Sequence, residues 1–279
     1  DLKLKKGYFE DKAKVDKPRF LTPMLAEEYD PERLQKPLCL ELQPKLDGIR
    51  CIFTKEGAFS REGNPIEVVP HIAKRLAPLF EKDPTLEFDG ELYNHKYKDN
   101  FDKIVSLVRK TNLASKKKKV VEEILKEAEE AIQYWIYDIR GPGGFKARIN
   151  KLVQLLRTDN VLPLVYVPTY SCDSFQVMEE LYKRFLEEGF EGMMVRQDLP
   201  YEFKRTYSLM KRKPMKTKEF LALDVLESKG NKKGYAAKIL VQVADGITSE
   251  ISMKGDRKFC ADFLKNKKKV IGKMVTSEF

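Results

Sequence analysis

The sequence predicts a mixed α+β protein with one large domain followed by a small, β-rich domain. Between residues 39 and 213, strand-like segments are interspersed with amphipathic helical segments, and no internal repeat is visible. Near Met215 the composition shifts to short apolar segments separated by Gly-rich turns. A chain of 279 residues is long enough to bury a substantial core in the first domain and still form a second one.

Turn residues define the elements in the first part of the chain. Residues 1–20 are Lys-rich and aperiodic, so we expect a basic N-terminal arm there. In residues 39–69, apolar stretches are interrupted by Asp-Gly, Glu-Gly and Gly-Asn-Pro. This pattern indicates strands joined by tight hairpin turns. Residues 68–80 have the spacing of a helix.

The segment 86–92 alternates strictly between apolar and acidic residues, which predicts a strand. Its acidic side chains, Glu87, Asp89 and Glu91, then lie on one face. Aromatic and β-branched runs predict the later strands, and amphipathic runs predict the later helices. In order, these elements are a helix at 120–133, a strand at 134–139, a helix at 147–156, a strand at 164–167, a helix from Ser174 to Gly189, and strands at 191–196 and 209–213.

The C-terminal segment is the most basic part of the chain. From residue 216 to the end there are 14 Lys and Arg against 8 Asp and Glu, which is +6 of the total charge of +10. We expect strands at 220–226, 237–243 and 251–253, which are short and separated by Gly-rich turns. This arrangement is typical of a small β-barrel of the oligonucleotide-binding (OB) kind.

Charge and cysteine usage narrow the class of protein. The net charge of +10 favours a polyanionic partner, either nucleic acid or an anionic membrane. A membrane is excluded because no apolar run approaches the length of a span and the N-terminus has no apolar signal core. The four cysteines are scattered without a Cys-x-x-Cys pair, which excludes a zinc ribbon and argues against a disulfide framework. We therefore expect an intracellular protein.

The segment Lys45-Leu46-Asp47-Gly48-Ile49-Arg50 carries the first chemical signal. A lysine amine is a nucleophile only when neutral, and the reference pKa of lysine is about 10.4. Nearby cations such as Arg50, Lys211, Lys213 or a bound metal would favour the neutral amine. The Asp-Gly turn would let the backbone approach a phosphate. By itself, the segment is equally compatible with a surface hairpin that carries an ordinary lysine.

Two later segments have the residue types that a phosphate-binding site needs. Lys211 and Lys213 occupy positions i and i+2 of a strand, so their side chains are expected on one face. Glu191 begins a segment that then turns apolar. A carboxylate at such a position is costly unless it is paired with a cation or a metal.

The Lys45 segment resembles motif I of the covalent nucleotidyltransferases, the superfamily of polynucleotide ligases and mRNA capping enzymes. Five further motifs resemble those of the superfamily and follow in its order. They are Ser60-Arg61 (motif Ia), Phe88-Asp89-Gly90-Glu91-Leu92 (motif III), Trp135-Ile136-Tyr137-Asp138 (motif IIIa), Glu191-Gly192-Met193-Met194-Val195-Arg196 (motif IV) and Leu209-Met210-Lys211-Arg212-Lys213 (motif V). The resemblance implies a nucleotidyltransferase (adenylation) domain of antiparallel sheets flanked by helices.

The resemblance also implies how a nucleotide is held. Lys45 would attack the α-phosphate, expel pyrophosphate and become a lysyl-N–AMP phosphoramidate. Gln43 and Pro44 would border the adenine base, and Glu91 would bind the ribose, with a second role in metal binding. Tyr137 would stack on the purine, although aromatic residues at such positions are also often simply core residues.

The remaining site residues would bind charged groups. By resemblance, Lys211 and Lys213 contact the α-phosphate, and Glu191 helps to hold a divalent ion, Mg²⁺ or Mn²⁺. Arg50 and Arg61 would hold the ribose and phosphates of the nucleotide or the 5′-phosphate of a nick, because the guanidinium fork suits phosphate.

Details of the motifs select one branch of the superfamily. Motif IV of capping enzymes usually reads Asp-Gly-Leu-Ile, whereas Glu191-Gly192-Met193-Met194 is ligase-like. NAD-dependent ligases carry a nicotinamide-binding domain and a four-cysteine zinc module, and neither is present in this sequence. The chain therefore resembles a compact ATP-dependent DNA ligase of the viral and phage type. An RNA ligase, a GTP-using capping enzyme and a non-catalytic nucleic-acid clamp are the alternatives.

The resulting expectations concern domains and partners. Residues 1–20 would be the basic arm, 21–215 the adenylation domain and 216–279 the OB-fold domain. The partner would be nicked duplex DNA, bound by a monomer. The final basic stretch of compact ligases, motif VI, is not found in the last residues. If the chain is truncated there, self-adenylation from ATP should be slow.

Overall fold

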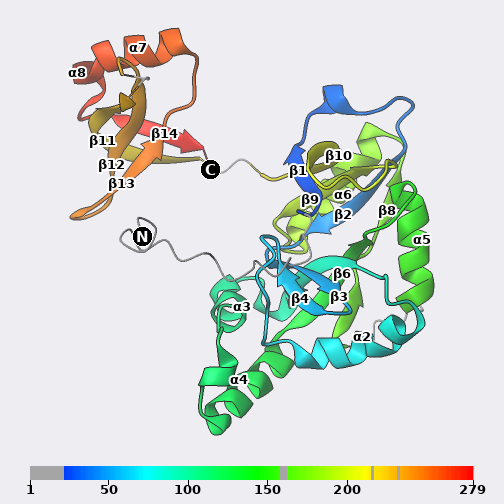
Figure 1. Ribbon diagram of the computed structural model, residues 1–279. Coiled ribbons are helices and arrows are strands. Elements are labelled where there is room, and N and C mark those ends of the chain that lie inside the picture. Colours follow the sequence, from blue (N-terminus) through cyan, green and yellow to red (C-terminus); the bar gives the residue numbers. More distant parts are fainter. Residues whose placement is uncertain (1–21, 157–161, 215–216, 231–232, 279) are drawn as a thin grey trace, which may run out of the picture. The chain divides into compact units, whose positions relative to one another are not determined.

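The computed structural model describes residues 22–156, 162–214, 217–230 and 233–278. These residues form two compact units, one ending at Lys213 and the other beginning at Pro214 (Figure 1). The first unit contains two five-stranded sheets with helices beside them, and the second contains one four-stranded sheet. This mixed architecture confirms the predicted α+β class.

The first sheet carries the Lys45 strand between the central strand and one edge strand. Its spatial order is β1 (Leu25–Glu28), β10 (Arg205–Arg212), β9 (Gly192–Gln197), β2 (Leu40–Lys45) and β8 (Tyr170–Cys172). All neighbours pair antiparallel except β1, which is parallel to β10. Helix α6 (Phe175–Glu187) packs on this sheet, with Met178 and Phe185 in the apolar cluster that it shares with the strands.

The second sheet contains the strands of motifs III and IIIa. Its order is β4 (Gly57–Ser60), β3 (Ile49–Thr54), β5 (Phe88–Tyr93), β6 (Gln133–Ile139) and β7 (Leu164–Tyr166). All neighbours are antiparallel except β6 and β7. The helices that contribute to its apolar cluster are α2 (Pro70–Lys82), α3 (Phe101–Val108), α4 (Lys118–Ala131) and α5 (Phe145–Leu156).

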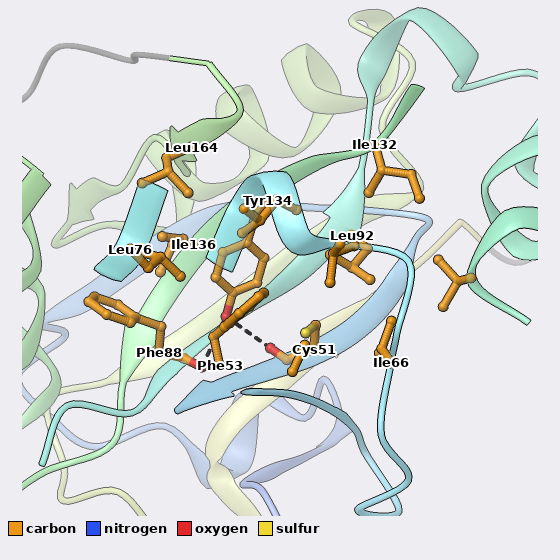
Figure 2. Close-up of a cluster of buried hydrophobic side chains, with 14 of the residues drawn as sticks. Cys51, Phe53, Ile66, Leu76, Phe88, Leu92, Ile132, Tyr134, Ile136 and Leu164 are labelled. Atoms are coloured by element: carbon orange, nitrogen blue, oxygen red, sulfur yellow. Dashed lines mark hydrogen bonds between the residues drawn. The ribbon is translucent and has the colours of Figure 1, made fainter. Parts of the chain in front are cut away.

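Tyr134 lies at the centre of the larger apolar cluster (Figure 2). Its ring is fully buried beside Phe53, and the ring centroids are 5.4 Å apart. Its hydroxyl lies 3.0 Å from the carbonyl oxygen of Cys51 and 2.9 Å from that of Phe88. One polar group in an apolar core is thereby satisfied by two strands of the same sheet.

A smaller cluster lies behind the Lys45 strand. It contains Leu46, the residue that follows Lys45, together with the buried Tyr93 and Val167. The single tryptophan of the chain, Trp135, packs against this cluster with its ring edge-on to that of Tyr93 at 5.3 Å.

The second unit is a twisted antiparallel sheet in the order β13 (Ile247–Ser252), β12 (Ala236–Ala244), β11 (Thr217–Glu227) and β14 (Met274–Glu278). Within the residues that the structure describes, the edge strands β13 and β14 do not pair, so a closed barrel is not formed. Helices α7 (Arg257–Lys265) and α8 (Lys267–Val270) precede β14. Asp256 caps α7 by accepting a hydrogen bond from the backbone N–H of Phe259, 2.7 Å away.

Most expected elements are confirmed, with ends shifted by a few residues. The expected helix 120–133 instead runs from Lys118 to Ala131, and Gln133 already belongs to β6. The expected strand 209–213 begins earlier, at Arg205, and ends at Arg212. Strands β1, β8 and β14 and helices α3, α7 and α8 were not expected, and the predicted basic arm 1–20 lies outside the described residues. No helix in the described segments has the length and apolar character of a membrane span.

Replacing Tyr134 with Phe should lower the free energy of unfolding by about 1–2 kcal/mol, because the one buried O–H donor that two carbonyl groups share is lost. Urea denaturation followed by circular dichroism measures this difference. The exposed Tyr207 provides the matched control, since Tyr207→Phe removes the same oxygen without burial. Equal stability of the two variants would contradict the structural role of the Tyr134 hydroxyl.

Candidate active site

A cavity of about 410 Å³ lies between the two sheets of the first unit. Strands β1, β2, β9 and β10 supply one side of it, and β3, β5 and β6 supply the other. The sequence-predicted residues that line it are Gln43, Pro44, Lys45, Arg50, Arg61, Glu91, Tyr137 and Lys211. Glu191 and Lys213 do not line the cavity but bond to each other beside Lys45.

Lys45 is the last residue of β2, at the point where the chain turns towards β3. The turn lies close against β5: a Cβ at Gly48 would come within 2.6 Å of the Cγ of Glu91 and of the carbonyl oxygen of Leu92. Only glycine fits there, so the motif I turn brings Lys45 and Glu91 to one site. The side chain of Lys45 is 18% exposed, which leaves the amine accessible from the cavity.

The Lys45 ammonium is paired with the carboxylate of Glu191. The backbone N–H of Glu191 donates to the carbonyl oxygen of Lys45 at 3.0 Å, so the two residues face each other across adjacent strands. The sequence predicts cations around Lys45, and its bonded partner is instead an acid. The cation Lys213 lies on the other oxygen of that same carboxylate.

Glu191 therefore bridges two lysines. Burial would raise the pKa of its carboxyl, but hydrogen bonds and charge from Lys213 and Lys45 outweigh burial and lower it below its ordinary value. A Cβ at Gly192 would lie 2.2 Å from the carbonyl oxygen of Arg212. The glycine after Glu191 thus lets the end of β10 approach closely enough for Lys213 to reach the carboxylate.

Lys211 and Lys213 have different partners. Lys211 lies within β10, lines the cavity and pairs with Glu28 of β1 at 2.8 Å. Lys213 follows the end of β10 and pairs with Glu191. The two motif V lysines therefore place one cation at the cavity wall and one beside the nucleophile.

Among the acidic side chains of the site, that of Glu91 has the pKa furthest from its ordinary value. Burial raises its pKa from 4.5 to about 8, against the opposing charges of Lys45 and Arg50. The phenol of Tyr137 lies 3.4 Å from one of its oxygens. At neutral pH the carboxyl of Glu91 is therefore protonated and can donate a hydrogen bond as well as accept one.

Tyr137 lies in the cavity wall, and the guanidinium groups of two arginines contact its ring. The carbon Cζ of Arg50 lies 5.9 Å from the ring centroid, and that of Arg196 lies 5.4 Å away. Both distances fall within the range of cation–π attraction. The ring is thus held at the cavity by charged groups as well as by the apolar cluster that contains Leu46.

Arg50 is fixed by three hydrogen bonds. Its Nε and Nη2 donate to the two carboxylate oxygens of Asp89 at 2.9 and 2.6 Å, and Nη1 donates to the carbonyl oxygen of Met24 at 2.7 Å. Burial opposes the charged guanidinium, yet the adjacent carboxylate raises the pKa of Arg50. Burial would likewise raise the pKa of Asp89, and the charge of Arg50 lowers it.

Gln43 belongs to a second buried polar network. Its amide nitrogen donates to the carbonyl oxygen of Tyr137 at 3.1 Å and to the hydroxyl of Thr169 at 2.9 Å. Its amide oxygen accepts from Nε of Arg196 at 2.7 Å, and Arg196 also donates to Asp138 at 3.1 Å. Because a carbonyl and a guanidinium fix the two ends of the amide, the orientation of Gln43 is determined.

The comparisons with known proteins agree with this geometry. A profile of the family described as "ATP dependent DNA ligase domain" matches residues 23–218, which is more than half of the chain. The chain belongs to this family. The match confirms the predicted ATP-dependent DNA ligase. A comparison with curated proteins found no match.

Solved DNA ligases share the fold. A structure from the work "DNA binding with a minimal scaffold: Structure-function analysis of Lig E DNA ligases" has a TM-score of 0.67 and 22% identity, covering 92% of this chain and 91% of that chain. Bacteriophage T7 DNA ligase in complex with ATP has a TM-score of 0.55 and 17% identity, with 93% of each chain covered. Chlorella virus DNA ligase-adenylate has a TM-score of 0.53 and 24% identity, covering 93% and 92%.

Several polar residues of this ligase site were not singled out from the sequence. Arg205 lines the cavity and donates to the carbonyl oxygen of Ala26, whereas the predicted Arg61 is exposed and pairs with Glu62 at 2.9 Å. Asp89 and Arg196 are buried charged residues in apolar strands. A charged residue within an otherwise apolar strand can be recognised in the sequence, and it indicates a buried charge that needs a partner.

The raised pKa of Glu91 predicts how the stability of the ligase depends on pH. Between pH 4.5 and about 8 the unfolded chain releases this proton while the folded protein retains it, so stability falls as pH rises. Glu91→Gln should therefore gain stability relative to the wild type on going from pH 5 to pH 8, by at least about 1 kcal/mol. Urea titrations of both proteins at the two pH values measure this difference, and parallel pH profiles would contradict it.

Proposed function

We propose that this ligase seals 3′-hydroxyl/5′-phosphate nicks in duplex DNA in three steps. Lys45 attacks the α-phosphate of ATP and takes AMP with release of pyrophosphate. The 5′-phosphate of the nick then takes AMP with release of the lysine, and the 3′-hydroxyl attacks that 5′-phosphate and releases AMP. The observation that carries the proposal is the position of Lys45, at the edge of a cavity lined by Arg50, Arg61 and Lys211. A nucleophilic amine beside several cations suits attack on a polyphosphate.

Glu191, the acid beside Lys45, has a role in the first step that follows from its pKa. Because the pKa of Glu191 is lowered, its carboxylate is a weak base at neutral pH. It therefore orients the Lys45 amine and balances the charge of Lys213. Once phosphates enter the site, Lys213 gains a competing anionic partner, and the hold of Glu191 on Lys213 weakens.

The cavity also suits the rest of the nucleotide. Its volume of about 410 Å³ lies within the range typical of small-molecule sites, about 300–1,000 Å³. Tyr137 offers a ring for stacking on the purine, and Gln43 and Pro44 border the base. Protonated Glu91 can donate to and accept from ribose hydroxyl groups. Arg50, Arg61 and Arg205 would bind phosphates of ATP or of the nick.

A divalent ion fits the donor set. Mg²⁺ is commonly held by one or two carboxylates together with substrate phosphates, so the ionised Glu191 would be its first protein ligand, and Glu91 would join it only on losing its proton. Within the described residues no group of three or more His, Cys, Asp or Glu side chains forms a site independent of substrate. When bound with ATP, Mg²⁺ or Mn²⁺ would neutralise the charge that develops on the phosphates.

We assign residues 21–215 to the adenylation domain and 216–279 to an OB-fold domain that contacts DNA. The antiparallel sheet of the second unit and its excess of 14 basic over 8 acidic residues support this assignment. We further propose a monomeric, intracellular enzyme.

The deciding experiment is the intact mass of the protein after incubation with Mg²⁺ and ATP in the absence of DNA. An adduct of one AMP is expected with ATP and not with GTP or NAD⁺, and EDTA should prevent it. Lys45→Ala should form no adduct, whereas Lys74→Ala, which removes an exposed lysine outside the cavity, should behave as the wild type.

Sealing assays complete the test. Lys45→Ala should lose sealing of a 5′-phosphate nick by at least a thousand-fold, while gel-shift binding of the nicked duplex remains nearly unchanged. Sealing retained by Lys45→Ala contradicts the mechanism. A GMP adduct would place the chain with the capping enzymes, and preferential sealing of RNA strands would indicate an RNA ligase.

A further inference from the structure

Four residues form a closed ring of hydrogen bonds between the two sheets of the first unit. Arg50 donates to the carbonyl oxygen of Met24 at 2.7 Å, and the backbone N–H of Met24 donates to the hydroxyl of Tyr201 at 3.1 Å. The Tyr201 hydroxyl donates to Oδ2 of Asp89 at 2.7 Å, and Asp89 accepts from Arg50. Three of these residues belong to the motifs or to strands beside them, and Tyr201 lies in the loop before β10.

We propose that Tyr201 is a positioning residue for nucleotide binding, because its hydroxyl fixes both Arg50 and the cavity wall that follows Met24. This inference rests on the proposed adenylation of Lys45 in the cavity. Tyr201 itself does not line the cavity, and it acts through Asp89 and Met24.

The hydrogen-bond donors of Arg50 show how the ring of hydrogen bonds prepares this residue for a ligand. A guanidinium has five N–H donors, and Arg50 uses three of them on Asp89 and Met24. Two donors, one on each Nη, remain for a ligand in the cavity that Arg50 lines. Because Asp89 is held from its other side by Tyr201, the plane of the guanidinium and the direction of these two donors are set before a ligand arrives.

The hydroxyl of Tyr201 also holds one wall of the cavity. Leu25 and Ala26, which follow Met24, line the cavity. Their pairing with β10 is irregular: Ala26 lies opposite Thr206, but Glu27 lies opposite Met210, so three residues of β10 are skipped between them. The hydrogen bond from Met24 to Tyr201 fixes the chain on the cavity side of this irregularity.

The ring of Tyr201 has a separate role that a phenylalanine preserves. The guanidinium carbons of Arg148 and Arg140 lie 5.5 and 6.0 Å from its centroid, and Leu209 and Met24 share its apolar cluster. Burial and the neighbouring Asp89 carboxylate raise the pKa of Tyr201, so its phenol stays protonated and remains a donor. Tyr201→Phe therefore removes the hydroxyl, with its hydrogen bonds to Met24 and Asp89 and its contact with Arg140, and retains the packing.

The test is the rate of self-adenylation of full-length Tyr201→Phe across a range of ATP concentrations. We expect KM for ATP to rise about ten-fold with kcat changed by less than about two-fold, because Arg50, which the lost contacts position, would hold ATP in the ground state and the transition state alike. The control Tyr207→Phe, which removes an exposed hydroxyl, should retain both constants. Tyr201→Phe with the wild-type KM overturns the proposal, and so does a variant that has lost its fold.

A second variant separates positioning from general destabilisation. Asp89→Asn should also raise KM, and adding Tyr201→Phe to it should raise KM by less than about two-fold more, since both changes break one linkage. Effects that multiply would overturn the proposal. Absence of any adduct in the wild type would contradict the proposed function itself, whereas normal adduct formation with unchanged KM contradicts only the role of Tyr201.

Discussion

A buried carboxylate, that of Asp138, links the two sheets at the cavity. Asp138 is fully buried on β6 and accepts from Nε and Nη2 of Arg148 at 2.9 and 3.1 Å and from Arg196 of β9 at 3.1 Å. The main apolar clusters of the two sheets are separate. The small cluster of Leu46, Tyr93 and Val167, together with polar linkages, therefore joins the sheets near the cavity. Losing one partner of such a buried group typically costs about 3–5 kcal/mol, because the remaining charge has no water to solvate it.

The site uses two such linkages, and both end on residues with proposed nucleotide contacts. Asp138 fixes the side-chain amide of Gln43 through Arg196. The hydroxyl of Tyr201 fixes Arg50 through Met24 and Asp89. A buried ion pair adds little net stability compared with apolar packing, but it has a narrow range of acceptable geometries. The cavity of this ligase thus gains defined donor positions from interactions that contribute modestly to its stability.

The sequence was sufficient for the class of fold and for the family, and it singled out eight of the nineteen residues that line the cavity. Lys45, Glu91 and Tyr137 lie in short segments whose residue types are dictated by close approach and by chemistry, and Gly48 and Gly192 occupy positions where a side chain would collide. These constraints act over a few neighbouring positions, so a motif records them. The ligase family was recognisable for the same reason.

The rest depends on contacts between distant parts of the chain. Met24 and Tyr201 are 177 positions apart, and neither is unusual for its own segment. Arg205 precedes a predicted strand and gains its place at the cavity only because β1 pairs with β10. Strand spacing likewise cannot determine whether two edge strands meet, and among the described residues β13 and β14 of the second unit do not pair. Helix α7 has an amphipathic pattern in the sequence, although no helix was predicted there.

The position of Trp135 gives this ligase an internal optical probe. It is the only indole of the chain and packs against the cluster of Leu46, the residue next to the proposed nucleophile. Its Nε1–H donates to the side chain of Gln133 at 2.9 Å, so the ring orientation is fixed. Because Trp135 does not line the cavity, a bound base would not quench its emission by direct contact. A change in its fluorescence would report movement of the Lys45 turn itself, without any attached label.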